Sequence, residues 1–344
     1  MIFIPHSRMN HEVCMFDVGH GDCVLISDDK GQGLLVDCGA WKHRHYLGIP
    51  QIIENLLLAN NRCGFVVSHY HWDHYNLFRG FKLPNALFSK IYLPNLPIVG
   101  PGREATLAIM DFLKVAVYAN FLSYRILPEI FTKTRRPVVF CEKGTPIHEA
   151  SLPLKVFWPD LSHPTLGSRK VKKKACIIRE IVEPIMDRYN IPKPSDYYTD
   201  YSMEKFFQQL KEIPYFDLQE RERRKIHETL KQIERVFSKL ADIFSIAFRT
   251  HYSRGTKFLF LGDLTNDLLN RITIPGNKQY DCLKAAHHGT RFGSALRNIS
   301  TDFILISRSQ RDFPNIKQIN SGYISEIQYH ILLCTEFLGD CYIH

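Results

Sequence analysis

The stretch Phe65-Val66-Val67-Ser68-His69-Tyr70-His71-Trp72-Asp73-His74 ends an apolar run with four potential metal ligands within six residues. Side chains two residues apart in an extended segment point to the same side, so His69 and His71 can bind one ion together. A backbone turn after them would direct Asp73 and His74 towards a second ion. The alternative interpretation is a histidine-rich loop that packs or hydrogen-bonds and binds no metal. The spacing favours a metal site for two adjacent ions.

Four other short apolar runs also end in potential ligands and glycines. Each run has the length and composition of a buried strand. Their polar ends are Asp17-Val18-Gly19-His20-Gly21-Asp22, Asp37-Cys38-Gly39, Gly262-Asp263 and His287-His288-Gly289. Taken alone, an Asp-Gly or Gly-Asp pair is more typical of a tight turn. Their joint occurrence around a histidine-rich loop predicts that several strands deliver donors to one site.

In order and context, these motifs resemble those of the metallo-β-lactamase-fold hydrolases. The closest likeness is to the metal-binding domain of ComEC, the bacterial competence protein of DNA uptake, and its free-standing relatives. The stretches that carry it are Phe16–Asp22, Leu35–Gly39, Ser68–His74, Phe260–Asp263 and Leu283–Thr290. The resemblance implies an α/β fold, namely a four-layer αβ/βα metallo-β-lactamase sandwich with a helical basic insertion. One departure is Tyr75-Asn76-Leu77, which stands where the family usually has a Gly-Gly turn into a helix.

The motifs imply two divalent metal ions, roughly 3.5 to 4 Å apart, that activate a water molecule as the nucleophile. The ions would be zinc or manganese, because the ligands are N and O donors without Cys. The expected ligands are His69 and His71 for the first ion, and Asp73, His74 and His287 for the second. We expect Asp263 to bridge the two ions, and we take Asp73 and Asp263 as the catalytic residues.

Four further residues are candidates for the site. His288 is the second choice after His287, because a strand-end pair can direct only one ring squarely at an ion. His148 and His163 are the candidates in the middle of the chain for a further ligand, although neither follows a convincing strand. Asp37 is expected to orient a ligand or a turn rather than to contact metal.

The composition of the chain fits one large domain over residues 1–344. Its 45% hydrophobic and 23% charged residues suit a large buried core. No run approaches the roughly 18 to 20 apolar residues of a membrane span, and the N-terminus lacks the pattern of a signal peptide. We therefore expect a soluble, cytoplasmic protein without a membrane partner. Nine scattered cysteines without a Cys-x-x-Cys pair fit reduced thiols.

Residues 161–240 are an insertion relative to the ComEC-like proteins, and we expect a helix-rich lid or docking subdomain. The insertion has 17 Lys and Arg against 12 Asp and Glu, in a chain of net charge +9. Its cationic run consists of Arg169, Lys170, Lys172, Lys173 and Lys174. Such a run is often a solvated loop, but beside a hydrolase site it would attract nucleic acid or a nucleotide. The alternative is a surface where a partner protein docks.

Two other segments of the middle region have a predicted structure. Residues 104–131 have the pattern of one helix, whose apolar stripe we expect to pack on the sheet. The tyrosines Tyr197, Tyr198 and Tyr201 would either form the core of a small helical insertion or stack on bases.

These features favour a metal-dependent phosphodiesterase or nuclease that acts on nucleic acid or nucleotides. The ComEC-like motifs and the basic charge both favour a phosphodiester as the substrate. One alternative is a small-molecule ester or lactone-type hydrolase, because the same fold hosts several hydrolytic reactions. The other is a non-catalytic protein in which the metals are structural and the insertion binds a partner.

Overall fold

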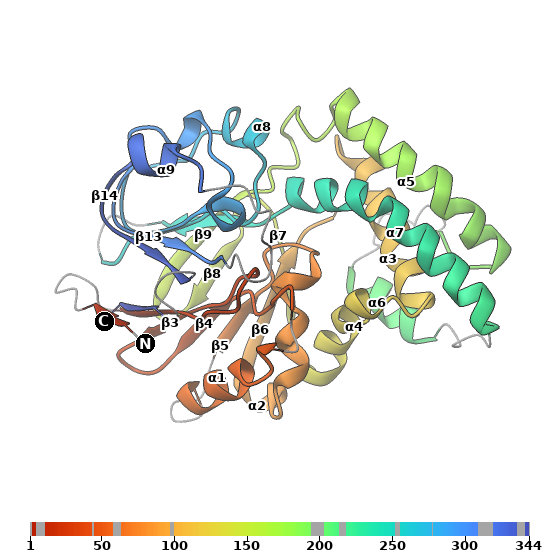
Figure 1. Ribbon diagram of the computed structural model, residues 1–344, viewed down its shortest axis with the longest axis horizontal. Coiled ribbons are helices and arrows are strands. Elements are labelled where there is room, and N and C mark those ends of the chain that lie inside the picture. Colours follow the sequence, from red (N-terminus) through yellow and green to blue (C-terminus); the bar gives the residue numbers. More distant parts are fainter. Residues whose placement is uncertain are drawn as a thin grey trace. The chain divides into compact units, whose positions relative to one another are not determined.

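The computed structural model describes residues 2–4, 11–42, 45–57, 63–96, 100–193, 203–212, 218–251, 255–276, 278–308, 319–335 and 341–343. The chain divides into two compact units. The first unit consists of Met1–Pro94, Lys133–Pro159 and Ser245–His344, and the second of Asn95–Thr132 and Asp160–Phe244. The first unit is mixed α/β and carries both sheets, whereas the described part of the second is helical (Figure 1).

The first sheet of the α/β unit has eight strands among the described residues. In spatial order they are β1 (Ile2–Ile4), β15 (Cys341–Ile343), β2 (His11–Met15), β3 (Val24–Asp28), β4 (Gly33–Val36), β5 (Cys63–Val66), β6 (Phe88–Pro94) and β7 (Val138–Cys141). The strands β4 to β7 run parallel, and β2, β3 and β4 are antiparallel neighbours. The parallel strands β4 and β5 therefore end at the same edge of the sheet.

The second sheet has seven strands in the part of the chain that is described. They are β14 (Gln328–Cys334), β13 (Ser300–Ile306), β12 (Gln279–Lys284), β11 (Phe258–Phe260), β10 (Ala247–Thr250), β9 (Leu152–Trp158) and β8 (Pro146–Glu149). The strands β11 to β14 are parallel, and β8 to β11 are antiparallel. The strands β11 and β12 also end at a common edge.

One hydrophobic core joins the inner faces of the two sheets. Alternate residues such as Val24 and Ile26 on β3 face it, as do Phe258 and Phe260 on β11. This period of two is what a strand buried on one face requires. Figure 1 shows α1 (Ile49–Leu57) and α2 (Pro84–Leu87) outside the first sheet, and α8 (Asn266–Leu269) and α9 (Gly322–Ser325) outside the second. The expected α/β sandwich is thereby confirmed.

The second unit is built from α3 (Arg103–Tyr118), α4 (Leu122–Thr134), α5 (Arg169–Arg188), α6 (Met203–Glu212) and α7 (Glu220–Ile243). The single helix predicted over residues 104–131 is wrong, because the chain bends by 95° between α3 and α4. Its apolar stripe packs on helices rather than on a sheet: Phe112 of α3 stacks on Phe237 of α7 with ring centroids 4.2 Å apart. The three tyrosines 197, 198 and 201 lie outside the described residues.

No single helix of the described residues has both the length and the apolar composition that a bilayer crossing requires. The bent pair α3 and α4 meets those criteria only when its two helices are taken together.

Candidate metal centre

The histidine loop leaves β5 and turns into the interior of the α/β unit. Ile246 N donates a hydrogen bond to Ser68 O at 2.7 Å, which ties the loop to the start of β10. Residues Trp72–His74 then form one turn of 3₁₀ helix, η2. As a result His69 and His74 are fully buried, although histidine is a polar side chain. Buried polar groups need partners, so the loop concentrates donors where they must be satisfied.

The loop after β4 packs backbone to backbone against the histidine loop. A Cβ at Gly39 would collide with the backbone of Asp73, so only glycine fits at that position. Cys38 N donates to His74 O at 2.8 Å and joins the two loops. The Asp-Cys-Gly motif thus serves close packing beside the cluster.

Asp263 lies at the centre of the cluster and is 1% exposed. Asp263 lies in the turn after β11 and directly follows Gly262, which adopts a positive φ of 51°. Its Oδ2 atom lies 3.6 Å from His69 Nε2, 3.7 Å from His74 Nε2 and 3.5 Å from His287 Nε2. These distances are too long for hydrogen bonds. Two ligand atoms that share a tetrahedral ion at about 2.1 Å would themselves be about 3.4 Å apart.

His69 and His71 converge on one side of Asp263. His69 Nε2 lies 2.8 Å from His71 Nδ1, and donor atoms of these two residues and Asp263 all lie within 4.8 Å of one another. His71 is half-buried, whereas His69 is fully buried. The spacing of two residues has placed both rings on the same side, as the extended geometry predicts.

His287 and His288 both reach the cluster. Each adopts a positive φ, 47° and 56° respectively, which breaks the strand alternation that would send their side chains to opposite faces. His287 Nε2 approaches Asp263, whereas His288 Nε2 lies 3.9 Å from Asp73 Oδ2. The first ring is 30% exposed and the second 1% exposed.

Asp22 and His20 belong to the cluster, although the sequence interpretation did not assign them as ligands. Donor atoms of Asp22, His74, Asp263 and His288 lie within 4.8 Å of one another, and so do those of a second group, His20, Asp73 and His288. The signal was present, because both residues lie in the stretch Asp17-Val18-Gly19-His20-Gly21-Asp22, which follows an apolar run.

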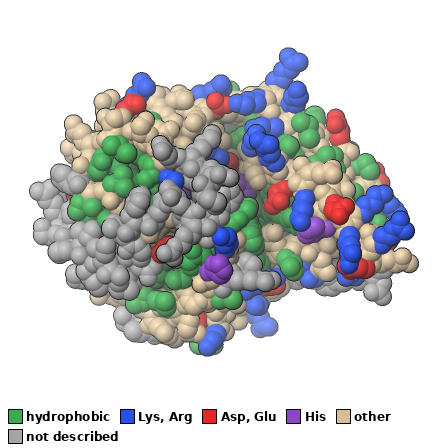
Figure 2. All heavy atoms as spheres, viewed as in Figure 1, with side chains coloured by type: hydrophobic (Ala, Val, Ile, Leu, Met, Phe, Trp, Pro, Cys, Tyr) green, Lys and Arg blue, Asp and Glu red, His purple; other side chains and the backbone are tan. Residues whose placement is uncertain are grey.

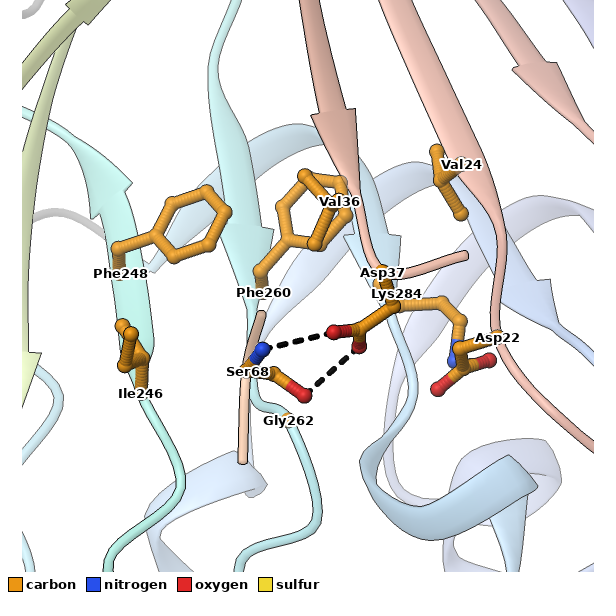
Figure 3. Close-up of a pocket in the computed structure, with 10 residues that line it drawn as sticks. All are labelled: Asp22, Val24, Val36, Asp37, Ser68, Ile246, Phe248, Phe260, Gly262 and Lys284. Atoms are coloured by element: carbon orange, nitrogen blue, oxygen red, sulfur yellow. Dashed lines mark hydrogen bonds and ion pairs between the residues drawn. The ribbon is translucent and has the colours of Figure 1, made fainter. Parts of the chain in front are cut away.

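Lys284 is the buried cation behind these ligands. Its Nζ lies 2.7 Å from Asp22 Oδ1, and the two side chains are 5% and 6% exposed. Figure 3 shows both beside a small cavity between the sheets, whose polar wall also includes Asp37 and Ser68. The cavity measures about 10 Å³, which is room for one water molecule.

Asp37 holds His74 in one orientation and tautomer. Its carboxylate accepts hydrogen bonds from Ser68 N and Ser68 Oγ, both at 2.7 Å (Figure 3). Asp37 Oδ2 also lies 2.9 Å from His74 Nδ1. Because a carboxylate only accepts, Nδ1 must carry a hydrogen, so Nε2 is the nitrogen of His74 that can give up its proton and bind a metal ion. Asp37 therefore stands where it orients a ligand.

The pKa values of the cluster reflect burial and dense carboxylates. Burial, together with His74 and His71, holds the pKa of His69 well below its usual range. Burial lowers the pKa of His74 as well, but Asp37, Asp263 and Asp73 outweigh this effect and raise it. Burial and the neighbouring His288 lower the pKa of His20 to about 3. Neutral rings such as His20 and His69 keep the lone pairs that metal ions need.

The residues present fit a metal ion. His74 Nε2 is fully buried and has no hydrogen-bond partner among the described residues, although carboxylate oxygens stand 3.7 and 4.0 Å away. Buried carboxylates require positive charge, and an ion would satisfy them and this nitrogen together. The cluster can therefore hold metal, through donors that are all imidazole nitrogen or carboxylate oxygen.

The two histidines proposed from the middle of the chain stand elsewhere. His148 is exposed on β8, at the edge of the second sheet, and is not among the donors of the cluster. His163 lies in the helical unit, where Thr165 N donates to its Nδ1 at 3.3 Å.

The cationic run forms the first turns of α5 rather than a loop. Ser168 caps the helix, because Val171 N donates to Ser168 Oγ. The cations follow as Arg169, Lys170, Lys172, Lys173 and Lys174, with no acidic residue in the first turn. Positive charge at a helix N-terminus opposes the helix dipole, so this arrangement costs stability. Lys172 pairs with Glu104 at 3.4 Å on the surface. Figure 2 shows many Lys and Arg side chains on the face of the molecule that it views.

Comparison with protein-family models finds no match for this chain, and comparison with curated proteins finds no significant match.

Proposed function

We propose that this chain is a metal-dependent hydrolase with a metallo-β-lactamase fold, and that it cleaves phosphodiester bonds in nucleic acid or nucleotides. The observation that carries the proposal is the position of Asp263 Oδ2, 3.5 to 3.7 Å from three imidazole nitrogens, two from the histidine loop and one from His287 after β12. A carboxylate oxygen that faces three imidazole nitrogens at this separation suits a ligand shared between metal ions.

The two-sheet sandwich supports the proposed fold. The cluster collects residues that follow β2, β4, β5, β11 and β12, and so lies where strands of both sheets end. The same five strand-end motifs carry the resemblance to the ComEC-like proteins. Fold and motifs thus point to the same edge of the sandwich.

We assign two divalent ions, zinc or manganese, to the cluster. The residues that would hold one ion are His69, His71 and Asp263, and those that would hold the other are Asp22, Asp73, His74, His288 and Asp263, with His20 beside them. His287, which the sequence motifs assigned to the second ion, approaches the shared carboxylate of Asp263 and would bind beside it. Bound ions would lower the pKa of a water molecule and stabilise charge on the attacked group. Asp37 would keep the His74 lone pair directed at the site, and Lys284 would offset the charge of Asp22.

An anionic substrate is favoured by Arg291. Its guanidinium donates to the backbone carbonyl of Asp263 and is half-buried. Burial lowers the pKa of His287 most, and the positive charge of Arg291 lowers it further. A fixed cation beside the ligands can stabilise negative charge that develops on a phosphoryl oxygen. The excess of basic residues in the chain, +9 overall, acts in the same direction at longer range.

The test is a metal-supplemented activity screen over single-stranded DNA, duplex DNA, RNA, cyclic dinucleotides and a generic phosphodiester, with ester and lactone substrates as the comparison. His69→Ala and Asp73→Ala should each lower turnover by several orders of magnitude, because loss of either ion removes the activated water. His148→Ala, an exposed histidine outside the cluster, is the matched control and should keep wild-type turnover. Residual activity above about a tenth of wild type in either cluster variant would contradict the proposed chemistry.

The same screen separates the alternatives. Cleavage of ester or lactone substrates without phosphodiesters would favour a small-molecule hydrolase. Bound metal without any turnover would favour a structural metal and a role in partner binding.

The cations of α5 are proposed to bind the phosphate backbone of a polynucleotide. Neutralising Lys172, Lys173 and Lys174 together should weaken nucleic-acid binding and flatten its dependence on salt. Each lost phosphate contact should reduce the slope of log affinity against log salt by about 0.7 to 0.9. A small phosphodiester has no backbone to reach these cations, so its cleavage serves as the control. If the variant shows the same dependence of affinity on salt as the wild type, these cations do not bind phosphate and are only a solvated helix end.

A further inference from the structure

Two tryptophans stand beside the metal cluster, and the proposed chemistry gives them no role. Trp72 lies between His71 and Asp73 in the histidine loop, and its side chain is partly exposed. Trp41 is 41% exposed and belongs to the loop after β4. Their ring centroids are 6.0 Å apart and the ring planes meet at 72°, so the two indoles form a corner.

The backbone that carries Trp41 is fixed to the cluster. Trp41 N donates to His20 O at 2.6 Å, so the residue is tied directly to a candidate ligand. Asn76 clamps the preceding residue from both sides. Its Oδ1 accepts from Ala40 N at 2.9 Å, and its Nδ2 donates to Ala40 O at 2.6 Å. A rigid backbone lowers the entropy that an exposed aromatic side chain loses on binding.

Asn76 gives the departure in the Tyr75-Asn76-Leu77 segment a physical purpose. Asn76 is 2% exposed, and both its amide oxygen and its amide nitrogen bond to Ala40. A Gly-Gly turn has no side chain that could make these bonds. The buried Asn76 side chain therefore holds the loop that carries Trp41 in place.

From these contacts we propose that Trp41 and Trp72 form a base-stacking platform at the metal cluster. Their ligand would be the nucleobase next to the phosphate that the metal ions bind. This inference rests on the proposed function, because a base reaches the corner only if its phosphate lies at the cluster. Indole faces bind bases of any sequence by stacking. The platform thus selects phosphodiesters that carry a base over those that do not.

The first test compares cleavage of two oligonucleotides, one intact and one with an abasic analogue beside the scissile phosphate. Wild-type protein loaded with manganese or zinc should prefer the intact substrate by about 5- to 150-fold in kcat/KM, the range that one stacked base contributes. Trp41→Leu should bring this ratio close to 1, whereas Trp41→Phe should keep most of it. Leu83→Ala, at a residue that is 53% exposed elsewhere in the α/β unit, should keep the wild-type ratio. Metal content of each variant shows whether the cluster is intact.

The second test measures nucleotide binding by tryptophan fluorescence and does not depend on turnover. The chain has three tryptophans, and the third, Trp158, is 1% exposed. Titration with adenosine monophosphate should quench the emission of the metal-loaded wild type. The Trp41→Leu/Trp72→Leu double variant should show no quenching, because only Trp158 remains.

The outcomes separate the platform from the proposed function. Equal cleavage of intact and abasic substrates by the wild type would overturn the platform and leave the hydrolase. Quenching by the nucleotide without any cleavage would support the platform and contradict the hydrolase. Neither cleavage nor quenching would overturn both.

Discussion

Replacing Lys284 with methionine should destabilise the metal-free protein far more than its place in a strand suggests. Lys284 and Asp22 are 5% and 6% exposed, and the ion pair is 2.7 Å long. Burial raises the pKa of Asp22, but Lys284 and His288 outweigh that effect and hold it well below its usual range. The carboxylate is therefore charged in the native protein and needs a positive partner.

The expected loss follows from breaking a buried pair. Removing one partner leaves a buried charge and costs about 3 to 5 kcal/mol, in contrast to the 0 to 1 kcal/mol of an exposed pair. Metal should reduce the loss, because an ion that binds Asp22 with His74 and Asp263 brings positive charge back to the carboxylate. The destabilisation of Lys284→Met should thus be largest with a chelator present and smaller with zinc or manganese.

Urea denaturation with chelator and with metal measures both effects. Lys90→Met is the matched control, because Lys90 is an exposed lysine on β6, and it should change stability by less than about 0.5 kcal/mol. Adding Asp22→Asn to Lys284→Met should recover part of the loss in chelator, since neither charge of this pair then remains. If Lys284→Met unfolds at the same urea concentration as Lys90→Met in chelator, the pair is not a buried charge pair and the reasoning fails.

Three further changes test other parts of the structure. Asp37→Asn should weaken metal binding about 10- to 100-fold, because His74 loses the acceptor that sets its tautomer, and competition with a chelator measures this. Burial raises the pKa of Asp111 to about 7. The folded state then holds this proton more tightly than the unfolded state, so stability should fall as pH rises from about 4 to 7, by up to about 4 kcal/mol, and Asp111→Asn should flatten that slope in urea titrations at several pH values. Phe237→Ala should cost about 3 to 5 kcal/mol of stability by thermal or urea unfolding, since its fully buried ring stacks on Phe112.

Most residues of the cluster could be predicted from the sequence, because they lie in motifs at the ends of apolar runs. The spacing of His69 and His71 fixes a common side for both rings, and Gly262-Asp263 marks a tight turn at a strand end, so local rules were enough. The backbone of His287 and His288 follows no local rule. Positive φ at two adjacent histidines is imposed by the surrounding structure, and this brings both rings to the cluster.

Other features depend on contacts that sequence periodicity does not encode. A lysine at the end of a strand, such as Lys284, is expected to be exposed. Its role as the buried partner of the Asp22 carboxylate follows only from the structure. The apolar stripe of residues 104–131 indicates a buried face but not what covers it. Helices of the second unit cover α3, through contacts such as Phe112 on Phe237. Asn76 likewise acts through Ala40, which is 36 residues away in the chain.

Metal analysis of the purified protein tests the central claim most directly. Protein expressed with added zinc and manganese should contain close to two metal ions per chain, as the six expected ligands and the shared Asp263 carboxylate indicate. Asp263→Asn should halve or abolish this occupancy, and His148→Ala should leave it unchanged. No more than trace metal in the wild-type protein would contradict the metal centre and everything proposed from it.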